Sequence, residues 1–186
     1  MKSYTTLFAL ILLFIGLNAN QAVAQSADAP STNTEAMLED ITAYLKINDN
    51  LSTSGQITYD QIPSLKEAGF EVVVNLAPAD ESRNSLEGFL VTQEGMSYVQ
   101  IPVSWRDPSE RDLQMFFDVM ETNKDRKVYV HCFANMRVSA FVYLYRTLHQ
   151  DVSAKEAKAD LAKIWDPNSQ AQWSSFIDRM QEKHSG

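Results

Sequence analysis

Hydrophobic positions along the chain follow two alternating spacings. Compact apolar runs rich in β-branched residues predict buried strands at Glu71–Leu76, Met96–Val103 and Lys127–His131. Apolar residues at intervals of three and four predict helices before, between and after these strands. The helices are expected at Glu35–Leu45, Tyr59–Ala68, Ser85–Gln93, Asp107–Asn123, Arg137–His149, Ser153–Ile164 and Gln170–Lys183. The segment Leu51–Ile57 is compatible with either a turn or a short strand.

This order of elements predicts an α/β domain with a mostly parallel central sheet flanked by helices. In such sheets, ligands bind beyond the carboxyl ends of the strands. Three loops are expected at that edge, at Ala77–Asn84, Ser104–Pro108 and Cys132–Arg137. A functional site is therefore expected where these three loops meet.

The amino-terminal segment Met1–Ala24 has the pattern of a secretory signal peptide. Lys2 gives it a positive start, Leu7–Leu17 is an apolar run, and Ala22–Ala24 matches the small-residue cleavage pattern. The mature chain is then expected to begin at Gln25 and to be periplasmic or secreted. The alternative is an uncleaved anchor, although the apolar run is short for a membrane span.

The remainder of the chain divides into a short leader and one domain. Residues 25–34 are small and polar and predict a flexible leader. Residues 35–186 are expected to form the domain, because a mature chain of about 160 residues can build a substantial core. The formal net charge of -8 argues against nucleic acid or an anionic membrane as a partner. No membrane span is expected after signal cleavage.

The stretch Lys127–Val138 joins a predicted strand to a predicted helix through a short loop. The chain's single cysteine, Cys132, lies at the strand end, and Arg137 lies at the helix start. A helix N-terminus directs N–H groups and the positive end of its dipole at such a loop, which favours a thiolate and a bound oxyanion. Arg137 can add a two-pronged grip on phosphate. The backbone amides expected to complete this cradle are those of Phe133, Ala134, Asn135, Met136 and Arg137.

Cys132 is therefore the candidate nucleophile, in a loop with the minimum equipment for covalent phosphoryl or sulfur transfer. Its alternative is an inert buried thiol. Arg137 could instead form an ion pair with a neighbouring carboxylate, although a helix start is an unfavourable dipole position for a cation. His131 is expected to orient the loop by hydrogen bonding, and a purely structural histidine is equally compatible with the sequence.

Five segments of the chain resemble one family of enzymes. They are SGQIT at Ser54–Thr58, AGFEVVVNLAPADE at Ala68–Glu81, GMSYVQIPVSW at Gly95–Trp105, VHCFANMR at Val130–Arg137 and IWDP at Ile164–Pro167. The pattern resembles the bacterial dual-specificity-like, protein-tyrosine-phosphatase-like cysteine phosphatases, close to the beta-lactamase-hydrolase-like phosphatase domain. The resemblance implies a dual-specificity phosphatase-like fold and hydrolysis of phosphomonoesters, with a thiophosphate intermediate on Cys132 and phosphate bound by Arg137. It further implies that the substrate is a phosphorylated protein or a small phosphomonoester.

The loop departs from the family pattern in three ways. Four residues separate Cys132 from Arg137, where most cysteine phosphatases have five and rhodanese-type sulfurtransferases usually have four. The customary loop glycine is absent, and Asn135 can replace it because asparagine tolerates the left-handed conformation. Val138 separates the arginine from Ser139, the supporting hydroxyl that is the candidate to assist departure of the thiolate.

These departures leave two other functions open. One is a rhodanese-like sulfurtransferase that carries a persulfide on Cys132, and the other is a non-catalytic phosphate-binding protein. No metal or other cofactor is expected in any of the three cases. His131, His149 and His184 have no ligand spacing, and a single cysteine adds little to them.

The leaving oxygen of a phosphate ester needs a proton, which an acid on an adjacent loop would supply. Asp107 matches the position where related phosphatases carry this acid, and Asp80 is the reserve candidate. Each has a structural alternative, because Asp107 before Pro108 is a good helix start and Asp80 lies in a turn-forming loop. The tryptophans could line the pocket mouth or pack in the core. They are Trp105, Trp165 and Trp173.

Overall fold

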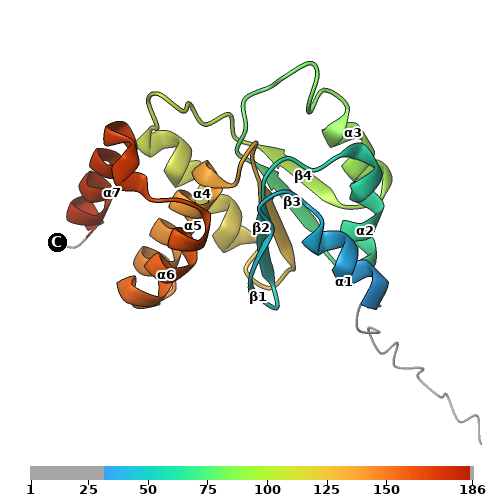
Figure 1. The fold of residues 1–186 in the computed structure, drawn as a ribbon, viewed down its shortest axis with the longest axis horizontal. Coiled ribbons are helices and arrows are strands. Elements are labelled where there is room, and N and C mark those ends of the chain that lie inside the picture. The colour runs from blue at the N-terminus through green and yellow to red at the C-terminus, as the bar shows by residue number, and fades with distance from the viewer. Residues whose placement is uncertain (1–31, 185–186) are drawn as a thin grey trace, which may run out of the picture.

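The computed structural model describes residues 32–184 (Figure 1). Its strands are β1 (Leu45–Asn48), β2 (Leu51–Ser54), β3 (Val72–Asn75), β4 (Ser97–Gln100) and β5 (Val128–His131). Its α-helices are α1 (Thr32–Glu39), α2 (Ile62–Glu67), α3 (Glu87–Gln93), α4 (Glu110–Thr122), α5 (Met136–His149), α6 (Ala154–Ile164) and α7 (Ala171–His184). Two 3-10 turns, η1 (Tyr59–Gln61) and η2 (Pro167–Ser169), complete the fold. The predicted signal peptide and most of the predicted leader lie outside the described residues.

The strands form one five-stranded sheet in the order β1-β2-β5-β3-β4. The four strands from β2 to β4 in this order are parallel to their neighbours, and β1 pairs with β2 in the antiparallel sense. The predicted α/β fold with a mostly parallel sheet is therefore confirmed. Polar residues end the four parallel strands in a single row across the sheet, namely Ser54, His131, Asn75 and Gln100.

The sheet separates two hydrophobic cores, because successive side chains of a strand point to opposite faces. On β3, Val72 and Val74 belong to the core built with α4, α5, α6 and α7. Val73 belongs to the other core, which includes Leu65 of α2 and Val91 of α3. Figure 1 shows α1, α2 and α3 on one side of the sheet and the remaining helices on the other. The continuous apolar run of β3 is thus explained by burial on both faces.

The predicted helix Glu35–Leu45 is wrong in its second half. Helix α1 ends at Glu39, and Leu45 begins strand β1. Ala43 adopts a φ of 51°, a left-handed conformation that an α-helix cannot contain. The chain turns there and pairs with β2, so pairing within the sheet overrides the helical spacing. The predicted leader is also too long, because Thr32–Thr34 lie in α1.

Several element ends differ from prediction for local reasons. Strand β4 ends at Gln100 rather than Val103, and Pro102 follows without an N–H group to continue a ladder. The ambiguous segment Leu51–Ile57 contains strand β2, which ends at Ser54. Within residues 32–184, no helix combines the length and apolar character that crossing a membrane requires.

Candidate active site

The loop from Cys132 to Arg137 joins β5 to α5 at the carboxyl edge of the sheet. Asn135 is the N-cap of α5 and has φ 59° and ψ -2°, which is the left-handed conformation. The prediction that Asn135 takes the place of a glycine in this loop is therefore confirmed. The left-handed residue turns the chain from the strand into the helix, which begins at Met136.

The β1–β2 hairpin supports this loop from one side. The Asn135 Nδ2 atom donates to the carbonyl oxygen of Ala43 at 2.8 Å and to the Oγ1 atom of Thr53 at 3.0 Å. Gly55, directly after β2, forms an isolated antiparallel bridge with Ala134. The hairpin and the loop are therefore one connected unit.

A side chain at Gly55 would not fit between the two segments. A Cβ atom there would lie 2.9 Å from the carbonyl oxygen of Thr42 and 3.1 Å from that of Phe133. The N–H group of Gln56 donates to the same Phe133 oxygen at 3.2 Å. The glycine of the segment Ser54–Thr58 therefore allows the loop and the hairpin to approach closely.

Cys132 lies in this loop with no exposed surface and packs in the larger core. Burial is equally expected of an inert core thiol, so it does not distinguish the two roles. In the described part of the chain, four loop amides donate to no carbonyl of another strand, turn or loop; they belong to Phe133, Ala134, Met136 and Arg137. Loop amides without a carbonyl acceptor between a strand and a helix are what an oxyanion cradle requires.

Arg137 is a buried cation without a carboxylate partner. It is 9% exposed, and its Nε atom donates to the carbonyl oxygen of Val103 at 2.9 Å. Its guanidinium carbon lies 5.4 Å from the ring centroid of Trp105 and 5.8 Å from that of Phe133. None of the ion pairs within residues 32–184 includes Arg137, so the alternative of a structural ion pair is not observed. A desolvated guanidinium of this kind favours an incoming anion.

A second arginine lies against the same loop. The guanidinium carbon of Arg83 lies 4.4 Å from the ring centroid of Phe133. The Arg83 Nε atom is also 3.7 Å from a carboxylate oxygen of Asp80, and both side chains are partly exposed. The loop after β3 therefore places one guanidinium beside the candidate phosphate cradle, and Asp80 of the same loop lies close to that guanidinium.

Asp107 lies exposed in the loop between β4 and α4. The N-cap of α4 is Ser109, whose Oγ atom accepts from the N–H group of Asp112 at 3.1 Å. The alternative in which Asp107 caps this helix is therefore wrong. The same loop contributes Val103 and Trp105 to the surroundings of Arg137, so Asp107 lies on the segment that borders the site.

Asp80 is held in a turn. Its carboxylate accepts from the N–H and hydroxyl groups of Ser82 at 3.0 and 2.7 Å. The hydrogen bond from the Ser82 hydroxyl, assisted by Arg83, holds the pKa of Asp80 below its usual value. A carboxyl group that is ionised more readily than usual is a poor proton donor at neutral pH. The structure thus weakens Asp80 as a candidate for the acid, and the role of Asp107 stays a prediction.

The Ser139 hydroxyl forms two hydrogen bonds. It donates to the carbonyl oxygen of Met136 at 3.2 Å and accepts from the indole nitrogen of Trp165 at 3.1 Å. These two contacts join α5 to the segment after α6. The arrangement therefore favours a packing role for Ser139 and gives no support to assistance of the thiolate.

The three tryptophans pack against one another. The ring centroid of Trp105 lies 5.5 Å from that of Trp165 and 5.2 Å from that of Trp173. Trp165 and Trp173 are buried in the larger core, whereas Trp105 is half-buried and also faces Arg137. Two of the three are therefore core residues, and Trp105 borders the site.

His131, directly before Cys132, is bound to a buried carboxylate that the sequence analysis missed. Its Nε2 atom lies 2.9 Å from the Oε1 atom of Glu87, the first residue of α3, and neither side chain has exposed surface. The role of His131 in orienting the loop stays a prediction, but its own orientation is fixed by this contact. No local pattern marks Glu87, because the two residues are far apart in the sequence.

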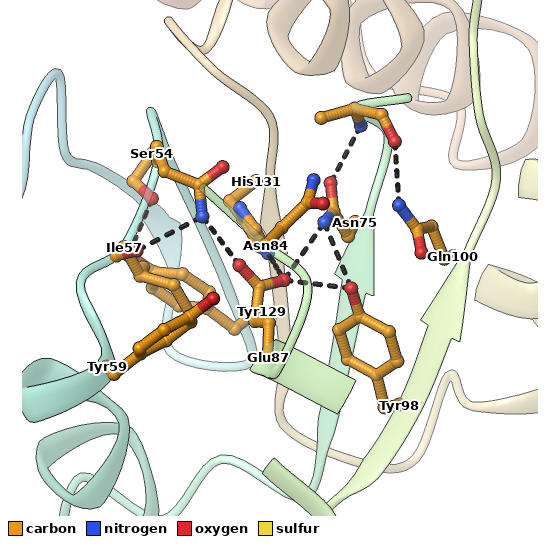
Figure 2. A network of polar contacts seen from close by, with 12 residues as sticks. Ser54, Ile57, Tyr59, Asn75, Asn84, Glu87, Tyr98, Gln100, Tyr129 and His131 are labelled. Atoms are coloured by element: carbon orange, nitrogen blue, oxygen red, sulfur yellow. Dashed lines mark hydrogen bonds and ion pairs between the residues drawn. The ribbon is translucent and has the colours of Figure 1, made fainter. Parts of the chain in front are cut away.

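Glu87 is the centre of a polar network that connects three strands to α3 (Figure 2). Its Oε1 atom also accepts from the Asn75 side chain and the Tyr98 hydroxyl, each at 2.9 Å, and Oε2 accepts from Gln56. Burial by itself would raise the pKa of Glu87, but His131, Tyr98 and Gln56 lower it below the ordinary value. Glu87 is therefore ionised at neutral pH.

Within residues 32–184, no group of three or more His, Cys, Asp or Glu side chains is arranged to hold a metal ion. The candidate catalytic groups are the thiol of Cys132, the guanidinium of Arg137 and the carboxyl of Asp107. Their assignment to catalytic roles stays a prediction.

Comparison with known proteins identifies the family of this chain. A family model described as "DSP-PTPase phosphatase fused to NAD+ Kinase" matches residues 23–179. The chain belongs to this family. A beta-lactamase hydrolase-like protein of Agrobacterium fabrum is 30% identical over 108 residues, which are 56% of this chain and 25% of the relative. This chain therefore spans about a quarter of the length of that relative.

Solved structures share the fold of the family. A candidate phosphatase (DUF442) of Shewanella putrefaciens CN-32 has 35% identity and a TM-score of 0.69, covering 80% of this chain and 97% of that one. P. aeruginosa TpbA, solved as a variant in complex with pTyr, has 13% identity and a TM-score of 0.60, covering 88% and 99%. At the latter identity the likeness shows the fold alone. The predicted relationship to cysteine phosphatases is confirmed at the level of family and fold.

Proposed function

We propose that this chain is a cysteine-dependent phosphomonoester hydrolase that acts through Cys132. The observation that carries the proposal is the state of Arg137, a guanidinium nine-tenths buried with no carboxylate partner among the described residues. This cation lies in the first turn of the helix that follows the only cysteine, and within residues 32–184 four loop amides beside it donate to no backbone carbonyl of another strand, turn or loop. A dianionic phosphate would satisfy both sets of groups.

In the first chemical step, the thiolate of Cys132 attacks phosphorus. The S–P bond forms while the bond from phosphorus to the ester oxygen breaks, and the leaving oxygen takes a proton from the Asp107 carboxyl group. Arg137 and the loop amides bind the equatorial oxygens and stabilise the charge that grows on them in the transition state. The product of this step is a thiophosphate on Cys132.

In the second step, a water molecule attacks the thiophosphate. The new P–O bond forms as the S–P bond breaks, the sulfur departs as a thiolate, and the water proton passes to the Asp107 carboxylate. Inorganic phosphate is then released, and both side chains have returned to their starting protonation states. Asp107 thus acts as acid in one step and as base in the next.

Sulfur transfer is the second candidate function, and one observation favours it. Only four residues separate Cys132 from Arg137, which is the loop length that rhodanese-type sulfurtransferases usually have. In that reaction Cys132 would carry a persulfide. The family match to phosphatases weighs against this alternative.

The deciding experiment measures both reactions with the same protein. The chain from Gln25 is assayed for release of phosphate from p-nitrophenyl phosphate and for transfer of sulfur from thiosulfate to cyanide. We expect phosphate release that vanadate inhibits and that Cys132→Ser abolishes. Sulfur transfer alone would establish the second function, and phosphate binding without either reaction would establish a non-catalytic binding protein.

The physiological substrate is proposed as a phosphorylated protein or a small phosphomonoester. Proteins that share the fold have been solved with pTyr and with PI(5)P bound. Both classes of ester therefore belong in the substrate panel that follows a positive result. The expected readout is the ratio of kcat/KM between a phosphotyrosine peptide and a phosphorylated lipid headgroup.

We further propose that the protein is exported and acts in the periplasm or outside the cell. The proposal rests on the signal-peptide pattern of Met1–Ala24. Mass spectrometry of the protein recovered from a periplasmic fraction would test it. A mature amino terminus at Gln25 is the expected result, and recovery of uncleaved chain with the cytoplasmic fraction would contradict it.

A further inference from the structure

Two arginines from different segments of the chain contact the same aromatic ring. The guanidinium carbon of Arg137 lies 5.8 Å from the ring centroid of Phe133, and that of Arg83 lies 4.4 Å from it. The two guanidinium carbons can therefore be no further apart than the sum of these distances. Arg137 is nine-tenths buried, whereas the side chain of Arg83 is 54% exposed. One cation thus lies inside the protein and the other lies at its surface, beside the residue that follows Cys132.

The turn before α3 defines the position of Arg83. Asn84 is buried, and its Oδ1 atom accepts from the N–H group of Asp80 at 2.8 Å while Nδ2 donates to the carbonyl oxygen of Pro78 at 3.0 Å. The N–H group of Arg83 donates to the carbonyl oxygen of Asp80 at 3.3 Å. Hydrogen bonds within the turn therefore hold the backbone of Arg83 beside Phe133, and only its side chain is free to adjust to a ligand.

The guanidinium of Arg83 has donors that no acceptor in the described part of the chain uses. Its ion pair there is with Asp80, and the distance of 3.7 Å from Nε to Oδ2 is longer than a hydrogen bond. The other carboxylate oxygen of Asp80 accepts from the N–H and hydroxyl groups of Ser82. An exposed ion pair of this length contributes little, so an anion that binds the guanidinium with two shorter hydrogen bonds can displace it.

We propose that Arg83 binds a second anionic group of the substrate, a carboxylate or another phosphate, while Arg137 and the loop amides hold the phosphate that is cleaved. The inference rests on the proposed function and narrows its substrates to phosphomonoesters that carry a second negative charge a few bonds from the ester. The whole chain has a net charge of -8, which repels anions at long range. Selection for a doubly anionic substrate must therefore come from a short-range contact such as the one that Arg83 offers.

The test compares two phenyl phosphates that differ in one charge. Meta-carboxyphenyl phosphate carries a second anion, and meta-carbamoylphenyl phosphate has nearly the same shape without that charge. The measured quantity is kcat/KM for the charged ester divided by kcat/KM for the neutral ester. The intrinsic reactivities of the two esters cancel when this ratio is compared between variants. Arg83→Gln should lower the ratio about tenfold, because it removes a charge-assisted hydrogen bond at a half-exposed position.

A second pair of esters distinguishes the two kinds of anion. Resorcinol bisphosphate carries a second phosphate, and resorcinol monophosphate carries a hydroxyl in its place. A larger effect of Arg83→Gln on this pair than on the first would identify a second phosphate as the preferred group. A larger effect on the first pair would identify a carboxylate.

Three further variants test the role of the positive charge. Arg83→Lys keeps the charge without the planar guanidinium and should restore only part of the ratio. Asp80→Asn should raise the ratio, because it removes the carboxylate that competes for Arg83 while its amide oxygen can still accept from Ser82. Arg126→Gln is the matched control. It removes an exposed arginine just before β5, at the opposite edge of the sheet, and should leave the ratio in place.

An equal ratio in the wild type and in Arg83→Gln would overturn the proposal. In that case, an equal loss of kcat/KM for both esters would show that Arg83 binds the cleaved phosphate itself or only supports Phe133. Absence of hydrolysis of every ester by the wild type would instead contradict the proposed function. The inference would then be decided by isothermal titration calorimetry of Cys132→Ser, which should bind the charged ester more tightly and lose this preference when Arg83→Gln is added. Equal affinities for the two esters would overturn it.

Discussion

Arg137 and Arg146 are both buried on helix α5, but only Arg146 is neutralised by carboxylates. Its Nη1 and Nη2 atoms lie 2.6 Å from Asp160 and 3.2 Å from Glu156. Arg137 instead contacts a carbonyl oxygen and two aromatic rings. Since desolvating an unpaired cation is costly, the chain retains one such cation at its candidate active site and none elsewhere on this helix.

The first prediction compares these two arginines. Arg137→Lys should lower kcat/KM for p-nitrophenyl phosphate by roughly 10²–10³-fold, because lysine cannot provide the two-pronged grip on the transition state. Its free energy of unfolding should change by less than about 1 kcal/mol, since no ion pair is broken. Steady-state kinetics and urea unfolding of the same preparation provide both numbers.

Arg146→Met is the matched control for this comparison. It should retain activity and lose roughly 2 kcal/mol of stability, because Asp160 and Glu156 lose their partner. The reverse pattern, with activity lost at position 146 and stability lost at position 137, would contradict the functional assignment of Arg137.

The second prediction separates catalysis from helix capping in the loop before α4. Asp107→Asn should lower kcat by roughly 10²–10⁴-fold for an ester with a poor leaving group and leave the unfolding midpoint unchanged. Ser109→Ala should retain activity and cost about 1 kcal/mol of stability, because it removes the N-cap that accepts from Asp112. Equal activity of Asp107→Asn and wild type would exclude Asp107 as the acid.

The third prediction concerns the left-handed conformation of Asn135 in the loop from Cys132 to Arg137. Asn135→Gly keeps the backbone conformation accessible but removes the side-chain bonds to Ala43 and Thr53, at a cost of about 1–3 kcal/mol. Asn135→Ala loses the same bonds and must also adopt a positive φ, which lowers the free energy of unfolding by about 1 kcal/mol more. Thermal unfolding should therefore rank wild type above the glycine variant and the glycine variant above alanine. Equal stability of the two variants would show that the loop relaxes to another conformation.

The fourth prediction is a loss of stability in acid. Burial alone would raise the pKa of Asp160, but Lys163 and Arg146 lower it below its ordinary value. A carboxyl with a lowered folded-state pKa stabilises the fold above its unfolded-state pKa, about 3.9. That stabilisation disappears as the pH falls through the folded-state pKa. The pKa of Glu87 is also lowered in the folded state, so its contribution to stability is likewise lost in acid.

Urea unfolding at a series of pH values measures this effect. The free energy of unfolding should decrease as the pH falls below about 4, and Asp160→Asn should show a shallower decrease from a lower starting value. A variant whose stability falls in parallel with the wild type over this range would show that Asp160 does not contribute.

The conformation of the loop from Cys132 to Arg137 could be predicted because its signals are local. A β-branched run, a Cys, an Arg and a helical pattern follow one another within residues 127–149. Asn135 in the left-handed conformation could be anticipated for the same reason, since few other residues tolerate it. The order of strands and helices likewise predicted the parallel sheet and the edge at which the loops meet.

Contacts between distant segments could not be predicted in this way. Glu87 has the polar character of an ordinary residue at a helix start, and only the folded chain brings it to His131. Strand β1 was missed because its apolar residues continue the spacing of α1 until the turn at Ala43 interrupts it. The N-cap of α4 was misplaced by two residues because both Asp107 and Ser109 satisfy capping rules.

The hydrogen bonds from Asn135 to Ala43, before β1, and to Thr53 of β2 limit how far the amino-terminal side of the domain can be shortened. A truncation beyond Thr42 would remove the carbonyl oxygen to which the Gly55 N–H group is bonded at 2.7 Å, and the next residue holds Asn135. Residues 132–137 are therefore not expected to keep their conformation outside this fold. If these residues were grafted between a strand and a helix of another protein, acceptors equivalent to the Ala43 carbonyl and the Thr53 hydroxyl would also be needed to hold Asn135.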